Sequence, residues 1–363
     1  MKIKTAYADG QSDQLKITAA ELDAPQANEV LVKMVATGIC HTDVAGRDGA
    51  TTPLPVALGH EGAGIVERVG ASVVGLTPGD HVVLSFSYCG HCANCLSGHP
   101  GLCTRFNDLN FGGHNYDGSH RLHLPDGQPL STFFGQSSFS TYTVVDQHGV
   151  VKVPQDLDLK MLAPLGCGIQ TGAGTVLNYL KPQFGESLVV FGTGTVGLAA
   201  MMAAKIAGVD HIVAVDIFDN RLALARELGA TETINSKTTD LATALQAILP
   251  AGADYTIDTT GVATVVKSAV HALKPGGQCV AVGIGGDITF NLMDDLLAEA
   301  KSLAGVVEGD AIPQLFIPQL VTYYRQGRFP FDKLIKFFAF DDINAGFAAS
   351  KDGSVLKPVV TFD

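Results

Sequence analysis

The stretch SLVVFGTGTVGLAAMMAAKIAGVDHIVAVD, residues 187–216, decides the fold of the second half of this chain. Its apolar start predicts a buried strand at residues 187–191, and the Ala- and Met-rich run predicts a helix at residues 195–207. A second buried strand is predicted at residues 211–216. A glycine-rich turn between a strand and a helix, followed by another strand, favours a parallel, doubly wound sheet.

The glycines of this stretch match the pattern G-x-G-x-x-G in the context that a dinucleotide site requires. Gly192 permits the tight turn, Gly194 lets the backbone approach a pyrophosphate, and Gly197 lets the helix pack on the sheet. Asp216 then ends the next strand, where its carboxylate can bind the ribose hydroxyls of adenosine and repel a 2′-phosphate. The pattern therefore predicts NAD rather than NADP. Arg221 could lie along the adenosine edge, or be a solvated arginine at a helix start.

Strands and helices continue to alternate after this stretch. We expect a helix at residues 220–228, a strand at 254–258, a helix at 265–273 and a strand at 278–283. The last fifty or so residues contain mixed elements and end in the strand-like segment VLKPVVTF.

The first 150 residues have a different pattern from the second half of the chain, because short β-rich runs alternate with Gly and Pro turns. We expect strands at residues 29–36, 62–69 and 80–86. Residues 104–140 are polar, Gly-rich and aromatic and are predicted to be long loops, which in compact domains are usually functional.

The length and net charge of the chain further limit the classes of function that it can have. A chain of 363 residues is expected to form two domains. The net charge of −12 argues against nucleic acid or an anionic membrane as a partner. The sequence has no run of roughly 18 apolar residues that could span a bilayer and no secretory signal at its start. Seven cysteines in such a chain favour the reducing cytoplasm.

Four of the cysteines form the run CGHCANCLSGHPGLC, with the spacing C-x2-C-x2-C-x7-C. Short gaps let the four thiolates converge, and four thiolates in a tetrahedron form a closed structural Zn²⁺ site. A disulfide knot is disfavoured without a secretory context. An iron–sulfur cluster is the main rival, but no Cys-Pro ends the run. The predicted ligands are Cys89, Cys92, Cys95 and Cys103.

Three further candidate ligands, Cys40, His60 and Cys167, each lie beside glycines. One His and two Cys would form a zinc site with an open position for water or substrate. Their convergence does not follow from spacing, since each alone is also typical of a buried core residue. Asp43 and Glu61 lie next to them and could orient the ligands or bind the metal temporarily.

These motifs together resemble the zinc-containing medium-chain alcohol dehydrogenases over nearly the whole chain. GHEGAGIVERVG, the four-cysteine run, GCGIQTGAG and GTGTVG occur in that family's order. The segments NFGG, FFGQSSF, PLGCGIQTGAG and FIPQL are most similar to bacterial aryl-alcohol (benzyl alcohol) and geraniol dehydrogenases. The resemblance implies an α/β fold with a mostly-β, GroES-like catalytic domain (residues 1–168 and 309–363) and a Rossmann-type NAD-binding domain (residues 169–308).

The resemblance also implies two Zn²⁺ ions per subunit. Cys40, His60 and Cys167 would bind the catalytic ion, with Glu61 behind it as a transient ligand and Asp43 supporting the ligands. The four-cysteine run would hold the structural ion.

Further roles follow from the same resemblance. Thr42 would receive the substrate proton, and Thr171 would pack near the nicotinamide. His41 and Lys357 fall where basic residues often meet the pyrophosphate. One departure concerns proton release, because Ala45 stands where many relatives have a relay histidine.

The expected activity is reversible oxidation of primary aromatic or allylic alcohols to aldehydes, with NAD as the hydride acceptor. Phe86, Phe111 and Phe139 are candidates for the pocket wall or plain core residues. The alternatives are a glutathione-dependent formaldehyde dehydrogenase, for which Arg105 and Arg121 are the nearby cations, a broad aliphatic alcohol dehydrogenase, and a catalytically silent NAD-binding protein. A homodimer or homotetramer is expected.

Overall fold

The computed structural model describes residues 1–362, and the chain divides into two compact units. The first unit comprises Met1–Cys167, Ile312–Val321 and Asp332–Asp363, and the second comprises Gly168–Ala311 and Thr322–Phe331. The predicted domain boundaries differ from these units at residue 168 and at residues 309–311 and 322–331.

The second unit contains a six-stranded parallel sheet in the order β13-β12-β11-β14-β15-β16. The chain starts at the centre of the sheet, builds outward to one edge, and then returns to build the other half. This reversal of strand order is the mark of a doubly wound sheet. The strands are β11 (Ser187–Phe191), β12 (His211–Asp216), β13 (Glu232–Asn235), β14 (Ala253–Asp258), β15 (Leu273–Ala281) and β16 (Ser302–Gly305).

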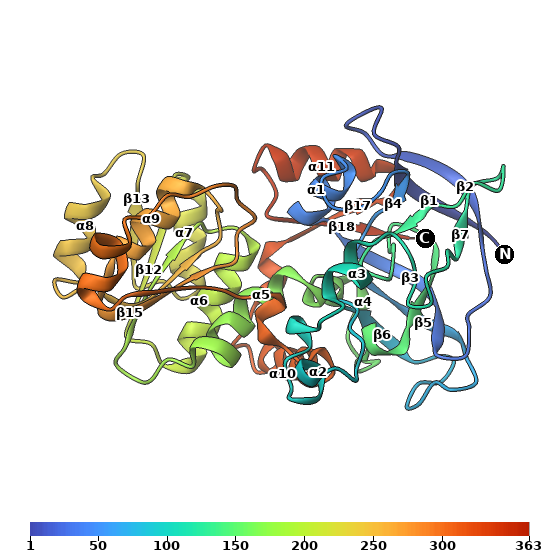
Figure 1. The fold of residues 1–363 in the computed structure, drawn as a ribbon, viewed down its shortest axis with the longest axis horizontal. Helices are drawn as coiled ribbons and strands as arrows, with labels where there is room; N and C mark the ends of the chain where they lie inside the picture. The colour runs from blue at the N-terminus through green and yellow to red at the C-terminus, as the bar shows by residue number, and fades with distance from the viewer. Residues whose placement is uncertain (363) are drawn as a thin grey trace. The chain divides into compact units, whose positions relative to one another are not determined.

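Central strand β11 is buried along its full length, as expected for a strand that helices cover on both faces. Helices α6, α7, α8 and α9 pack against the sheet (Figure 1), and α5 packs on α6 through small residues. This arrangement, with the mostly-β first unit, confirms the predicted fold class. The helices are α5 (Gly168–Gly174), α6 (Thr195–Ala207), α7 (Asp219–Leu228), α8 (Leu241–Ile248) and α9 (Ala263–His271).

The predicted boundaries of one helix and the strand after it differ from the structure. The helix expected at residues 265–273 ends at His271, and β15 starts at Leu273 rather than at residue 278. Pro275 disfavours helical backbone at the residue before it, Lys274, which agrees with the strand conformation there.

The first unit contains two mainly antiparallel sheets. A five-stranded sheet has the order β7-β2-β1-β4-β8, with β1 (Lys2–Ala8), β2 (Lys16–Leu22), β4 (Val56–Ala57), β7 (Leu122–His123) and β8 (Ser131–Thr132). A seven-stranded sheet has the order β10-β6-β5-β3-β18-β17, and β9 also pairs with β3. Its strands are β3 (Glu29–Gly38), β5 (Glu61–Val69), β6 (His81–Leu84), β9 (Tyr142–Asp146), β10 (Val150–Lys152), β17 (Ile335–Ala339) and β18 (Lys357–Thr361).

Short helices connect these strands. Residues 104–140, expected to be long loops, contain one helix and two strands of two residues each, so the prediction missed these short elements. The helices are α1 (His41–Arg47), α2 (Ala93–Leu96), α3 (Phe106–Phe111), α4 (Leu159–Leu162), α10 (Pro313–Arg325) and α11 (Ile343–Lys351). Of these, α10 starts in the first unit and ends in the second.

Three adjacent strands of the seven-stranded sheet bring distant parts of the sequence together. Gly38, at the end of β3, pairs with Glu61 on β5 and with Val359 on β18. A Cβ atom on Gly38 would lie 2.0 Å from Glu61 Oε2, so only glycine leaves room for this carboxylate. The strand register therefore places the residues near 40, 61 and 357 at one point.

Within residues 1–362, no helix combines the length and the apolar character that crossing a membrane requires.

Candidate metal and cofactor sites

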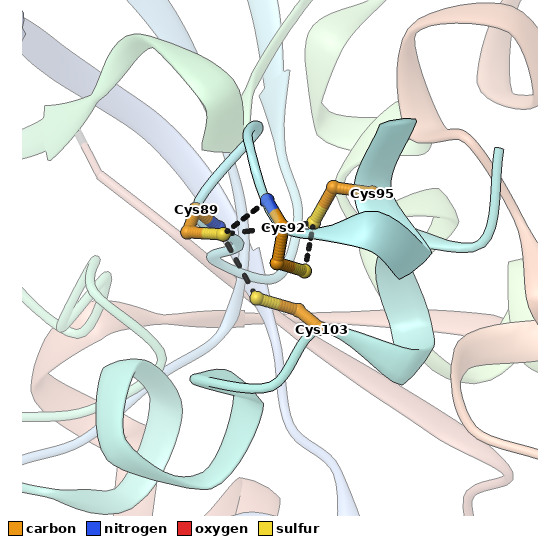
Figure 2. Close-up of side chains that lie close together, drawn as sticks. All are labelled: Cys89, Cys92, Cys95 and Cys103. Carbon is orange, nitrogen blue, oxygen red and sulfur yellow. Dashed lines mark hydrogen bonds between the residues drawn. The ribbon is translucent and has the colours of Figure 1, made fainter. Parts of the chain in front are cut away.

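Four cysteine side chains point toward one another in the segment after β6 (Figure 2). All are free thiols whose sulfur atoms lie within 4.8 Å of one another. Cys95 Sγ lies 3.5 Å from Cys92 Sγ and 3.9 Å from Cys89 Sγ. The chain positions them with a turn, the single turn of α2 and a short 3-10 helix, after which Cys103 follows. Four sulfurs at this separation can surround one metal ion.

Backbone amides donate to these sulfurs. The Cys92 N–H donates to Cys89 Sγ at 3.3 Å, and the Cys89 N–H donates to Cys103 Sγ at the same distance. Backbone N–H groups of Cys95 and Thr104 lower the pKa of the Cys92 thiol to about 5. Burial raises the pKa of Cys95 to about 12, so a metal ion would be needed to hold all four as thiolates.

A second cluster in the same unit consists of Cys40, His60, Glu61 and Cys167. One potential ligand atom from each lies within 4.8 Å of the others. Cys40 precedes α1, His60 directly precedes β5, and Glu61 is the first residue of β5. Cys167 follows the turn at residues 163–166. Hydrogen bonding to Cys167 lowers the pKa of the Cys40 thiol, against the effect of burial. The three ligands that spacing could not join therefore meet in the folded chain.

Asp43 fixes the orientation of His60. Its Oδ1 atom is 2.9 Å from His60 Nδ1 and accepts the Gly59 N–H at 3.1 Å, while its Oδ2 atom accepts the Cys40 N–H at 2.9 Å. This leaves Nε2 of His60 buried and without a hydrogen-bond partner. An imidazole that donates through Nδ1 and keeps Nε2 free is typical of a metal ligand with a supporting carboxylate, so the cluster fits Zn²⁺.

Aromatic rings cover His60. Phe134 stacks on the imidazole with ring centroids 4.6 Å apart, and Phe133 meets it edge-on at 5.4 Å. Phe111 packs on both phenylalanines. The other two candidate wall residues, Phe86 and Phe139, are buried in the same hydrophobic cluster as Phe133 and Phe134 but have no ring contact with His60 among the described residues.

The residues that contact His60 include three that sequence reasoning did not assign. Besides Phe133 and Phe134, Gln136 donates through Nε2 to the His60 carbonyl at 2.9 Å. All three belong to the segment FFGQSSF, which served only to mark the resemblance.

Lys357 forms a buried ion pair with Glu61 rather than presenting its charge to solvent. Its Nζ atom lies 2.8 and 2.9 Å from the two carboxylate oxygens and donates to the Ile39 carbonyl at 3.1 Å. Burial raises the pKa of Glu61, although the charge of Lys357 acts in the opposite direction. This placement does not support the predicted contact between Lys357 and a pyrophosphate.

The first turn of α1 carries the other predicted residues near this cluster. Thr42 is half-buried, and its Oγ1 atom lies 3.7 Å from Cys40 Sγ. His41 is exposed, and Ala45 offers no side-chain group that could carry a proton. The hydroxyl of Thr42 is therefore a polar group that the first turn of α1 places beside the cluster.

The glycine loop of the second unit has the geometry that a phosphate site requires. Gly192 has φ +92°, and a Cβ atom there would lie 2.4 Å from Thr259 Oγ1. A Cβ on Gly197 would lie 2.0 Å from the Gly192 carbonyl oxygen, so this glycine lets the helix close on the loop. A Cβ on Gly194, at the start of α6, would meet no atom within 4 Å. This open side of the helix N-terminus can receive an anion.

Hydrogen bonds to Asp216 stabilise this loop. Its Oδ2 atom accepts from the Thr193 N–H at 2.7 Å and from Thr193 Oγ1 at 2.6 Å, and Oδ1 accepts from the N–H groups of Ile217 and Phe218. These four donors match the four lone-pair sites of a carboxylate. A contact with ribose would therefore have to replace one of them. Sequence reasoning assigned Asp216 to the cofactor and missed Thr193.

The remaining predicted cofactor residues also lie in the second unit. The Arg221 guanidinium lies 4.9 Å from the centroid of the Phe218 ring, and its Nε atom is buried without a hydrogen-bond partner. Thr171 lies in α5, with its Oγ1 atom 3.5 Å from Glu308 Oε2.

Comparison with known proteins identifies the chain's relatives. Residues 26–155 match the family described as "Alcohol dehydrogenase GroES-like domain", and residues 195–321 match "Zinc-binding dehydrogenase". The chain is 44% identical to a geraniol dehydrogenase of Castellaniella defragrans over 96% of this chain and 94% of the relative. It is 35% identical to an S-(hydroxymethyl)glutathione dehydrogenase of Paracoccus denitrificans over the full length of both. The crystal structure of benzyl alcohol dehydrogenase from Acinetobacter calcoaceticus matches with a TM-score of 0.95 and 44% identity, covering all of both chains.

Substitution in either cluster should remove one metal ion per chain, with different effects on stability. Cys103→Ser should lose one ion and lower the Tm by about 5 °C or more, because the metal closes a loop with little core of its own. Cys167→Ser should lose the other ion with a smaller decrease in Tm, since the surrounding sheet is otherwise intact. Elemental analysis of the purified proteins and circular dichroism during heating measure both effects.

Cys279→Ala is the matched control, because this buried cysteine lies outside both clusters. It should keep the full metal content. Unchanged metal content in Cys103→Ser or Cys167→Ser would contradict the ligand assignment.

Proposed function

This chain belongs to the zinc-binding alcohol dehydrogenases, a family of oxidoreductases, and we propose that it oxidises primary aromatic or allylic alcohols to aldehydes with NAD⁺ as hydride acceptor. The observation that carries the proposal is the meeting of Cys40, His60 and Cys167 around the unpartnered Nε2 atom of His60. Two sulfurs and one imidazole leave one position of a tetrahedral Zn²⁺ ion for the alcohol. We assign the four-cysteine cluster to a structural ion, since it has no open position.

Bound Zn²⁺ would act as a Lewis acid that lowers the pKa of the alcohol hydroxyl. Thr42 is the residue we assign to accept the proton, because its hydroxyl lies beside Cys40. Asp43 keeps His60 in the tautomer that binds metal, and Lys357 neutralises Glu61 behind the cluster. Ala45 offers no relay base, so release of the proton to solvent would not use a side chain at that position.

We assign the second unit to the cofactor. The pyrophosphate would bind at the glycine loop, with Gly194 giving the closest approach to the N-terminus of α6. The adenosine half would lie near Asp216 and Arg221, and the nicotinamide near Thr171. We keep His41, which is exposed, as a candidate phosphate ligand, whereas the ion pair of Lys357 with Glu61 makes that lysine a poor one.

Two observations support an aromatic or allylic substrate. Phe133 and Phe134 form an apolar wall against His60, and the relatives of about equal identity are named for geraniol and benzyl alcohol. The glutathione-dependent alternative needs free cations for the glutathione carboxylates. Arg121 is buried and paired with Glu29 and Asp117, which removes it from that role.

Charge and cysteine chemistry support the remaining assignments. All seven cysteines are free thiols, which fits a reducing compartment such as the cytoplasm. The net charge of −12 fits a small-molecule enzyme rather than a nucleic-acid-binding protein.

A substrate panel followed by NADH absorbance tests the proposed activity. Benzyl, cinnamyl and geranyl alcohols should give kcat/KM values at least about tenfold above those for ethanol, because each buries more apolar surface against the phenylalanines. The Cys167→Ser protein is the negative control. A higher kcat/KM for hydroxymethylglutathione or for a secondary alcohol than for benzyl alcohol would overturn the substrate assignment.

Asp216 provides the test of cofactor choice. Asp216→Asn keeps the shape of the side chain and removes the charge that would repel a 2′-phosphate, so the preference for NAD⁺ over NADP⁺ should fall at least about tenfold. Thr193→Val is the matched variant, since it removes one hydrogen bond between the loop and Asp216 but keeps the negative charge of Asp216. Its preference for NAD⁺ over NADP⁺ should stay unchanged. An equal change in cofactor preference in both variants would mean that Asp216 acts only by holding the loop.

We also propose that the chain self-associates through β16, the edge strand of the parallel sheet. An edge strand offers unpaired backbone groups, and apolar side chains at Leu297, Leu303 and Val307 are exposed around it. A second copy of the chain could pair its own β16 with this edge and cover these residues.

Leu303→Glu should shift the protein to a smaller species in size-exclusion chromatography with light scattering, because two copies would bring the new charges together. Leu315→Glu, at an exposed position in α10, is the control and should leave the mass unchanged. A monomeric wild-type protein would refute the proposed association.

A further inference from the structure

The segment that follows β16 lies at the ligand-binding edge of the parallel sheet. In doubly wound sheets the dinucleotide binds across the carboxyl ends of the strands, at the point where strand order reverses. That point lies between β11 and β14. Asp216 ends β12 on one side, so the β14–β15–β16 side is left for the nicotinamide half. Residues 306–310 therefore belong to the nicotinamide side.

The backbone of this segment is unusual. Glu308, Gly309 and Asp310 have φ angles of +51°, +66° and +48°, so three successive residues are left-handed. Side chains with a Cβ atom rarely adopt this conformation, and it persists only where the surroundings impose it. Such strain is concentrated at functional sites.

Close packing against α5 imposes the conformation. A Cβ atom on Gly309 would lie 2.5 Å from the Gln170 carbonyl oxygen, and one on Gly174 would lie 2.3 Å from the Gly309 carbonyl oxygen. Asn178 Nδ2 donates to the same Gly309 carbonyl at 3.2 Å. The two backbones touch, so the segment and α5 are positioned as one piece.

This packing buries the Glu308 side chain, which is only 7% exposed. Its Oε2 atom accepts a hydrogen bond from Gln170 Nε2 at 3.0 Å, and Thr171 Oγ1 lies 3.5 Å from the same oxygen. Gln170 Nε2 and Thr171 Oγ1 both donate to this oxygen, and hydrogen bonds donated to a carboxyl group favour its ionised form. A negative charge is thus held next to Thr171.

We propose that Glu308 is a positioning residue that holds Gln170 and Thr171 and sets the electrostatic potential at the nicotinamide. This inference rests on the proposed function, which assigns Thr171 to the nicotinamide. The ring carries a positive charge in NAD⁺ and loses it on accepting a hydride. A fixed carboxylate nearby stabilises the charged ring and not the neutral one, so Glu308 raises the affinity for NAD⁺ relative to NADH.

Cofactor affinities of the metal-loaded protein without alcohol test this inference. NADH binding is measured by its fluorescence and NAD⁺ binding by calorimetry. Glu308→Gln keeps the size and one acceptor of the side chain, so the Kd for NAD⁺ should rise about tenfold while that for NADH changes less than about twofold. Glu308→Asp keeps the charge but withdraws it by one methylene, and its ratio of the two Kd values should lie between wild type and Glu308→Gln.

Asp210→Asn is the charge-matched control, because this exposed aspartate precedes the amino end of β12 at the opposite edge of the sheet. It should change neither Kd. Equal shifts for NAD⁺ and NADH in Glu308→Gln, or no shift, would show a purely structural role and overturn the inference. If Glu308→Gln does not fold, Glu308→Asp decides, and an unchanged ratio of the two Kd values overturns it. A wild-type protein that binds neither nucleotide would instead refute the proposed cofactor.

Discussion

The hydrogen bonds of one buried carboxylate, that of Asp43, are the constraint on which the proposed catalytic centre depends. The carboxylate joins the first turn of α1 to the segment before β5 through Cys40, Gly59 and His60. Each hydrogen bond to a charged group is worth about 1.5–3 kcal/mol, and an unpaired carboxylate at this depth would be strongly unfavourable. The fold that buries Asp43 therefore also fixes which nitrogen of His60 is free.

Carboxylates also hold neighbouring segments through hydrogen bonds in the second unit. Asp216 binds the backbone of the glycine loop, and Glu308 binds Gln170 beside Thr171. All three carboxylates lie within a few residues of the carboxyl end of a strand. A carboxylate only accepts hydrogen bonds, and the chain exposes unsatisfied N–H groups where it leaves a sheet and enters a helix. Acidic side chains at these points hold loops that ligands must find in a fixed shape.

Local patterns in the sequence predicted what depends on neighbouring residues. The four-cysteine run spans 15 positions, and the strand–turn–helix order around Gly192 predicted the doubly wound sheet. The meeting of Cys40 with Cys167 depends on strand pairing between distant segments, so only the resemblance joined them. Lys357 was assigned to the cofactor from the resemblance, and Asp216 from its place at the end of a strand. Their partners, Glu61 and Thr193, lie far along the chain or in a loop, and no local pattern reports such pairs.

The ion pair between Lys357 and Glu61 has a consequence for how the protein is made. The two residues are 296 positions apart, and Lys357 reaches Glu61 only when β18 has paired with β3. During synthesis, β3, β5 and the ligands Cys40, His60 and Cys167 all leave the ribosome before β18 exists. Until then, Lys357 cannot offset the charge of the Glu61 carboxylate. The order of translation thus delays the final charge balance of the centre until the last strand of the sheet is added.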